Sequence, residues 1–294
     1  MMSNDEFIQI FEKKAASIKD DTERSKKYRA GVATLAQKAI DSNDTAYLDA
    51  AIRFANNIID EPDRSKAYVD IVRSTSRVAR NTVNSDLVRR ALKISAKTIK
   101  GHDRSYAMEG VVSAIAEVCL NNNESDAIEF AKKLAESIEY DTYRSSSLRS
   151  IARTLHAADN NQSALDSAIE ALDIIDSSNS ISSTIYRASA YIDLSKLFLD
   201  LDQMDAANNC IHKAEESANS FMNEFERSSI YQSIVETRLI FGARTKNRIH
   251  FQRAVISFGQ ITKEYYRTFA MQKLKSILIN FNEEELIESL PKNN

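Results

Sequence analysis

The sequence predicts an all-α protein, a right-handed α-solenoid of about seven helix hairpins with 40 residues each. Three observations predict this fold class. The 294 residues include only 5 glycines and 2 prolines, too few for the turns of a β or α/β fold. An arginine recurs in the same local setting about every 40 residues, and the apolar residues after it follow a helical period. Each hairpin exposes an apolar stripe that only a neighbouring hairpin can cover, so the repeats are expected to stack.

The recurring arginine defines seven repeats that cover nearly the whole chain. Successive arginines are separated by 40, 40, 40, 43, 40 and 40 residues. They are Arg24, Arg64, Arg104, Arg144, Arg187, Arg227 and Arg267. We therefore expect repeats to start near residues 21, 61, 101, 141, 184, 224 and 264, within a single array over 1–294.

Each repeat contains two apolar stripes separated by a polar gap. The first stripe lies 4, 7, 8 and 11 residues after the arginine, and the second follows the gap. Residues at these spacings share one face of a helix, so each repeat is predicted to be a hairpin. Residues 1–20 keep the phase of a second helix and are expected to cap the N-terminus, while 283–294 form a C-terminal cap and tail. The three extra residues fall in 177–183, which we predict to be a flexible loop rather than a domain boundary.

The fourth and fifth repeats resemble the tetratricopeptide (TPR) family. The residues that carry the resemblance are Leu148, Ile151, Ala152, Leu155, Ala164, Ala168 and Ala171, and then Tyr191, Leu194, Ser195, Phe198, Ala207, Ile211 and Ala214. The other repeats depart from the family pattern. Their helix-to-helix turns are expected to be three or four residues longer, the usual proline is absent, and a small position holds Val32, Val72 or Val112. The chain is therefore described as TPR-like.

The recurring arginine is expected near the third residue of each first helix, where a cation opposes the helix dipole. A compensating partner is therefore needed. One reading is a structural ladder, in which each guanidinium bonds a carboxylate or the last carbonyls of the preceding helix. The carboxylates considered are Asp20, Asp60, Asp63 and Asp103. The alternative is an exposed comb that binds one phosphate or carboxylate per repeat.

The sequence contains no motif for phosphate-loop, hydrolase or metalloprotease chemistry, so we expect neither enzyme activity nor a cofactor or metal. Its histidines, one to a repeat, are predicted to be surface or packing residues; they are His102, His156, His212 and His250. Cys119 and Cys210 lie far apart and are expected to be buried structural thiols. The acidic N-terminus and the absence of a long apolar run predict a cytoplasmic protein without a signal peptide or membrane segment.

The TPR resemblance implies a concave groove lined by residues 2, 5, 9, 12 and 13 after each arginine. In repeats one to four these positions supply the proposed carboxylate contacts Lys26, Arg29, Lys66, Arg73, Arg77, Arg149 and Arg153. In repeats five to seven they are largely apolar, with Ile192, Leu199, Leu239, Ile240, Phe269 and Ile279. The alternatives are an ordinary solvated face for the basic part and inter-helix core for the apolar part.

Charge is unevenly distributed along the chain, whose net charge is −3. Between Arg64 and Arg104 there are 11 basic and 3 acidic side chains, a net charge of +8. We predict a non-catalytic scaffold that holds an extended or helical, partly acidic protein segment in the groove. The alternative is RNA binding through the basic second repeat, although the repeat tyrosines are expected in the packing stripe rather than on the groove face. Homodimerisation through the C-terminal repeats is a further expectation.

Overall fold

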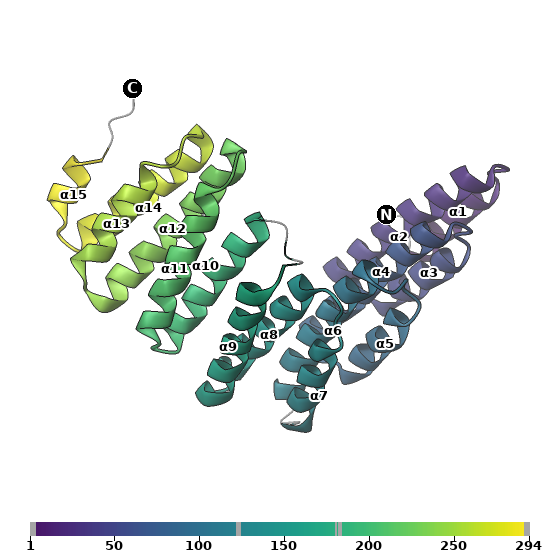
Figure 1. Ribbon diagram of the computed structural model, residues 1–294. Helices are drawn as coiled ribbons and strands as arrows, with labels where there is room; N and C mark the ends of the chain where they lie inside the picture. The colour runs from purple at the N-terminus through teal and green to yellow at the C-terminus, as the bar shows by residue number, and fades with distance from the viewer. Residues whose placement is uncertain (1–3, 122–124, 180, 182–183, 291–294) are drawn as a thin grey trace. The chain divides into compact units, whose positions relative to one another are not determined.

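The computed structural model describes residues 4–121, 125–179, 181 and 184–290 (Figure 1). Within them lie fifteen α-helices and no strand, so the predicted all-α array of helix hairpins is confirmed. The chain divides into two compact units, residues 1–160 and 161–294. Their boundary separates the two helices of the fourth repeat, whereas the loop predicted at 177–183 lies partly outside the described residues. A single array over 1–294 stays a prediction.

The first unit packs long first helices side by side and covers them with shorter second helices. Its helices are α1 (Asn4–Ala16), α2 (Asp21–Ser42), α3 (Thr45–Asn56), α4 (Glu61–Thr82), α5 (Ser85–Ser95), α6 (His102–Asn121), α7 (Ser125–Glu136) and α8 (Asp141–Ala157). Helices α2, α4, α6 and α8 contact one another in that order. Each of α3, α5 and α7 packs on the first helix before it and on the next one, and α1 packs on α2.

The second unit repeats this arrangement. Its helices are α9 (Asn161–Ser177), α10 (Thr184–Asp200), α11 (Met204–Asn219), α12 (Glu224–Thr245), α13 (Arg248–Phe258), α14 (Glu264–Asn280) and α15 (Glu284–Glu288). The hairpins are α10 with α11, α12 with α13 and α14 with α15, and the first helices α10, α12 and α14 pack in sequence. Helix α9 packs on α10. The short α15 occupies the place of the seventh repeat's second helix.

Capping residues explain where many helices begin. Asp20 and Asp60 accept backbone hydrogen bonds from the third residue of α2 and of α4, and Asn223 does the same at α12. Asp44 and Asn84 cap the second helices α3 and α5. These short polar side chains satisfy N–H groups that have no partner inside the helix.

The links inside the departing repeats correct one sequence expectation. We expected longer turns there, but α2, α4 and α12 are 22 residues long, against 17 for α8 and α10. Only two residues join α2 to α3 and α4 to α5, the first of them left-handed at Asn43 and at Val83. The extra residues thus lengthen the helix rather than the turn, because most residues differ in helix propensity by only tenths of a kcal/mol.

The core of each hairpin is built from the stripes found in the sequence. In the fourth repeat Leu148, Ile151 and Ala152 are all at most 1% exposed. In the first repeat Gly31 lets the rings of the flanking helices approach α2, since an added Cβ would lie 2.5 Å from Phe11 and 2.8 Å from Phe54. The close approach of the helices therefore depends on small residues where large side chains meet.

Candidate functional site

The recurring arginine binds the end of the preceding helix in most repeats. Its guanidinium donates to the carbonyl six residues earlier: Arg24 to Ile18, Arg64 to Ile58, Arg104 to Thr98, Arg187 to Ile181 and Arg267 to Ile261, at 2.6 to 3.2 Å. Arg144 pairs with Asp141, and Arg227 is partly buried at the equivalent place. A cation that opposes the dipole of its own helix therefore lies at the negative end of the preceding one. The contribution of this ladder to stability stays a prediction.

The serine that follows the arginine has a role that sequence reasoning missed. Ser25 accepts a hydrogen bond from the backbone N–H of Ile59, Ser65 from that of Ile99, and Ser228 from that of Thr262. Each donor lies 34 residues later, in the link that precedes the next first helix. The Arg-Ser pair thus connects its repeat to both neighbours, and the recurrence of serine after arginine was the available signal.

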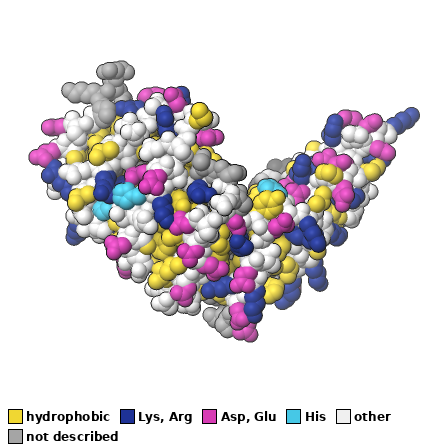
Figure 2. Space-filling view, in the orientation of Figure 1, with side chains coloured by type: hydrophobic (Ala, Val, Ile, Leu, Met, Phe, Trp, Pro, Cys, Tyr) yellow, Lys and Arg dark blue, Asp and Glu magenta, His cyan; other side chains and the backbone are white. Residues whose placement is uncertain are grey.

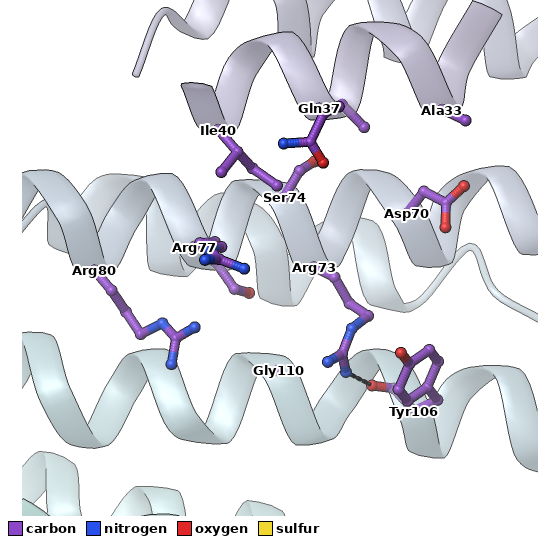
Figure 3. Close-up of a pocket in the computed structure, with 12 residues that line it drawn as sticks. Ala33, Gln37, Ile40, Asp70, Arg73, Ser74, Arg77, Arg80, Tyr106 and Gly110 are labelled. Carbon is purple, nitrogen blue, oxygen red and sulfur yellow. Dashed lines mark hydrogen bonds between the residues drawn. The ribbon is translucent and has the colours of Figure 1, made fainter. Parts of the chain in front are cut away.

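A cavity of about 330 Å³ lies between α2, α4 and α6 in the first unit (Figure 3). Arg73, Arg77 and Arg80 line it from α4, at a spacing that places them along one face of the helix. Gln37 of α2 and Tyr106 of α6 form part of the opposite walls. The cavity therefore contains two of the seven cations predicted for the groove, together with Arg80.

Three arginines in and beside this cavity already have an acidic partner. Each pairs with a carboxylate of the next first helix: Arg29 with Asp70, Arg73 with Glu109 at 2.6 Å, and Arg80 with Glu117 at 2.9 Å. Arg77 is exposed and makes no ion pair within the described part of the chain. Four arginines and three carboxylates leave one uncompensated positive charge in this region, located at Arg77.

Two further groups distinguish this cavity. The hydroxyl of Ser76 lies in its wall, 2% exposed, and has no hydrogen-bond partner. The Arg73 guanidinium lies over the ring of Tyr106, 3.9 Å from its centroid, and the centroids of the Tyr106 and Tyr143 rings are 5.2 Å apart. Tyr106 is two residues after Arg104, at a predicted groove position, so this face carries an aromatic side chain in addition to the repeat tyrosines of the packing stripe.

The remaining predicted contacts are dispersed. Lys26 is exposed and pairs with Glu23 on its own helix, and Lys66 and Arg153 are exposed. Arg149 is buried, with 6% of its surface exposed, so it does not present its charge to solvent. We therefore leave Arg149 out of the set of candidate contacts.

The apolar groove positions of the second unit divide into two groups. Ile192, Leu199 and Leu239 are at most 4% exposed and belong to the core, whereas Ile240, Phe269 and Ile279 are exposed by 43 to 60%. The first three residues therefore form inter-helix core, which was the alternative interpretation of these positions. The exposed group is the part of this face that remains accessible.

The strongly basic second repeat is partly neutralised by its neighbours. Besides Arg73 and Arg80, Arg90 pairs with Asp49 of the first repeat, and Arg89 pairs with Asp86. Lys97 lies over the ring of Tyr68. Basic and acidic side chains accordingly lie interspersed over the first unit (Figure 2). Apart from Lys97 and the recurring arginines, which bond backbone carbonyls, four side chains of this repeat are left without an ion pair in the part of the chain described, namely Lys66, Arg77, Lys93 and Lys100.

The cysteines and possible metal ligands were considered as reactive groups. Cys210 is fully buried, and burial raises the pKa of its thiol to about 12, so it stays protonated and unreactive. The side chain of Cys119 lies outside the described residues. Among the residues described, no group of three or more His, Cys, Asp or Glu side chains could hold a metal ion. No helix in the described ranges has the length and apolar character needed to cross a membrane.

Comparison with known proteins gives structural similarity only. No family model and no curated protein matches the chain. Among solved structures, the nuclear import adaptor Nro1 is 13% identical, with 98% of this chain and 99% of that chain covered and a TM-score of 0.39. A second structure of Nro1, from S. pombe, is 12% identical with a TM-score of 0.33, covering 90% and 99% of the two chains. Ton1535 from Thermococcus onnurineus is 15% identical, covering 90% and 94%, with a TM-score of 0.25.

Proposed function

We propose that the protein is a non-catalytic interaction scaffold that binds a segment of another protein across α2, α4 and α6. The observation that carries this proposal is Arg77, an exposed guanidinium without an ion-pair partner between two arginines that already have one. A carboxylate of the bound segment completes the row of pairs. The buried hydroxyl of Ser76, beside it in the chain, offers the same carboxylate a second donor.

The charge in the groove favours a segment with few acidic residues over a polyanion. Because only one positive charge is uncompensated, a bound carboxylate neutralises the region, whereas a run of phosphates would compete with Asp70, Glu109 and Glu117 for their arginines. Tyr106 adds a ring that packs against apolar or aromatic side chains of the segment. An extended or helical protein segment fits these contacts, and RNA becomes an outcome of the test.

The test combines capture with charge reversal. The wild-type chain and Arg77→Glu are used as baits in nuclease-treated native lysate, and captured proteins are identified by mass spectrometry. Lys93→Glu is the matched control, because it makes the same charge change in the same repeat, on α5 rather than in the cavity. We expect the partner to be lost with Arg77→Glu and retained with Lys93→Glu.

The number of ion pairs formed on binding is then measured with a synthetic peptide of the captured segment. One ion pair predicts that the logarithm of the association constant falls with the logarithm of the salt concentration with a slope of about 1. Equal capture by wild type and Arg77→Glu would contradict the proposal. Recovery of RNA before nuclease treatment, with a slope of several units, would favour the nucleic-acid alternative.

A further inference from the structure

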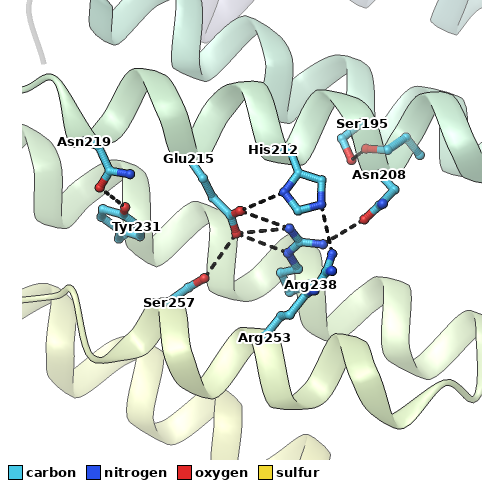
Figure 4. A network of polar contacts seen from close by, with 10 residues as sticks. Ser195, Asn208, His212, Glu215, Asn219, Tyr231, Arg238, Arg253 and Ser257 are labelled. Carbon is cyan, nitrogen blue, oxygen red and sulfur yellow. Dashed lines mark hydrogen bonds and ion pairs between the residues drawn. The ribbon is translucent and has the colours of Figure 1, made fainter.

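A second cavity, of about 360 Å³, lies on the second-helix side of the second unit, away from the residues used above. It is lined by side chains of α11, α12 and α13 and of the turn after α13, including His212, Asn219, Tyr231, Arg253 and Gln260. Beneath it lies a polar network centred on Glu215 and Arg238 (Figure 4). On the surface of this unit, histidine lies beside basic side chains (Figure 2).

Arg238 occupies a position that is otherwise part of the hairpin core. It lies 11 residues after Arg227, and the other six repeats have Leu, Thr, Ile, Leu, Phe and Leu at that place. Its side chain is fully buried. A buried ion pair is seldom more stabilising than apolar residues of similar size. The sixth repeat therefore departs from the pattern in a way that stability does not explain.

The carboxylate of Glu215 is fully used by this network. It accepts from Arg238 at 3.1 to 3.3 Å, from Ser257 at 3.3 Å, and lies 3.3 Å from Nδ1 of His212. Asn208 accepts a further bond from Arg238 at 2.9 Å. With its acceptor sites occupied and its charge balanced by Arg238, Glu215 does not repel an anion from the cavity.

Arg253 supplies the charge that has no counterpart. One of its N–H groups donates to Nε2 of His212 at 2.9 Å. Because arginine only donates, Nε2 carries no proton, and His212 is neutral with its proton on Nδ1, directed at Glu215. The described residues that line the cavity include no second carboxylate, so Arg238 and Arg253 together exceed Glu215 by one positive charge.

His250 lies close enough to the same arginines to be affected by their charge. It is 8% exposed, packs on Phe241 with ring centroids 4.3 Å apart, and has an Nδ1 without a partner. Burial, followed by the charges of Arg238 and Arg253, lowers its pKa to about 4.

We propose that this cavity binds a small molecule through one oxyanion group, a carboxylate or a phosphate, held by Arg253. The planar guanidinium keeps four N–H donors for it after its bond to His212. Tyr231 donates to the side-chain oxygen of Asn219 at 2.6 Å, which leaves the amide N–H₂ of Asn219 as a further donor, alongside Gln260. The Tyr231 ring and the exposed side chain of Ile256 form an apolar wall for the rest of the ligand.

The experiment titrates the full chain with inorganic phosphate and, separately, with succinate, at constant ionic strength. Binding is measured by calorimetry and by the imidazole resonances of the histidines. We expect saturable binding of at least one of the two anions with one site per chain, and a rise in the pKa of His250 on saturation. The anion that binds more tightly identifies the oxyanion as phosphate or carboxylate.

Variants separate this site from general anion binding. Arg253→Gln is expected to weaken binding at least about tenfold, because it removes a charged donor. Arg244→Gln is the control, since Arg244 is an exposed arginine that pairs with Asp200 and Asp202 outside the cavity. Gln260→Ala, at an exposed position, tests the site should Arg253→Gln fail to fold, and is expected to weaken binding less. No saturable binding, or equal binding by wild type and both cavity variants, would overturn the proposal.

Discussion

At the scale of single residues, the sixth repeat depends on a buried charge pair where its neighbours use apolar packing. Removing one partner of such a pair leaves the other charge buried and uncompensated, which costs about 3–5 kcal/mol. Replacing both partners by apolar side chains of similar size avoids that cost. The two partners here are Arg238 and Glu215, whose side chains are 0% and 23% exposed.

We therefore expect Arg238→Leu to lower the free energy of unfolding by about 3 kcal/mol, with the partly buried carboxylate of Glu215 left without its ion-pair partner. The double variant Arg238→Leu/Glu215→Met is expected to recover most of this loss. Urea denaturation of the three proteins measures both values. A double variant that is less stable than the single one would show that the pair stabilises the fold.

His250 predicts how stability depends on pH. Its pKa is about 4 in the folded protein, below the ordinary value of 6.5, so between these values the unfolded chain binds a proton that the folded chain does not. The stability associated with neutral His250 is thus complete above about pH 6.5 and is lost as the pH falls toward 4. The loss is on the order of 2–3 kcal/mol.

Denaturation curves at pH 7 and pH 4.5 test this prediction by comparing wild type with His250→Phe. The variant is expected to lose less stability than wild type over this interval, and His156→Gln, which changes a different histidine, is expected to behave as wild type. The same pH dependence in all three proteins would mean that His250 is not the titrating group.

At the scale of the element, helix ends rather than helix interiors connect the repeats. In five repeats the arginine near the start of the first helix donates to a carbonyl at the end of the preceding helix, and in three repeats the serine after it accepts from an N–H of the following link. These groups have no partner within their own helix or turn. The last carbonyl of a helix is thereby bound by an arginine 6 residues later in the sequence, and the link after that helix is bound by a serine 34 residues earlier.

Arg104→Met is expected to lower stability by about 1–3 kcal/mol and to leave partner binding unchanged. Arg104 donates to the carbonyls of Ala96 and Thr98, at 3.0 and 2.6 Å, and both lose that bond in the variant. Lys100→Met is the control, as it removes an exposed cation of the same link that has no ion pair. Thermal unfolding and peptide affinity are measured together. Lost affinity with unchanged stability would instead support the comb.

At the scale of the whole molecule, charge is balanced between repeats rather than within them. The second repeat has a net charge of +8, but its arginines pair with Asp49 of the first repeat and with Glu109 and Glu117 of the third. The whole chain has a net charge of −3, so acidic side chains in the other repeats outweigh the positive charge of the second repeat. The basic composition of one repeat therefore does not create an equally basic surface.

The balance predicts weak interaction with nucleic acid. We expect the purified chain to give no saturable mobility shift with single-stranded RNA at 150 mM salt, because the arginines that could hold adjacent phosphates are already paired with carboxylates. Saturable binding that weakens steeply with salt, and that is lost in a Lys66→Glu/Arg77→Glu variant, would reverse this prediction.

Sedimentation over a concentration range tests the separate expectation of a dimer through the exposed Ile240, Phe269 and Ile279.

The sequence by itself determined the helices, their pairing into hairpins and the phase of the repeat. These features depend on local periodicity, because apolar residues at helical spacing must share a face and that face must be covered. The arginines and the core residues Leu148 and Ile151 were found in this way. The sequence did not determine whether a polar stretch extends a helix or forms a turn, since propensities differ by only tenths of a kcal/mol per residue.

Only the tertiary structure decided which charges are available. Arg73 and Arg77 differ by one helical turn and are equivalent in the sequence pattern, yet Arg73 meets Glu109, 36 residues away, while Arg77 meets no carboxylate. Arg149 is likewise buried, although the sequence pattern places it on the groove face. Whether a side chain is paired, buried or open depends on groups that stacking brings together across about 40 residues, and such contacts leave no periodic signal in the chain.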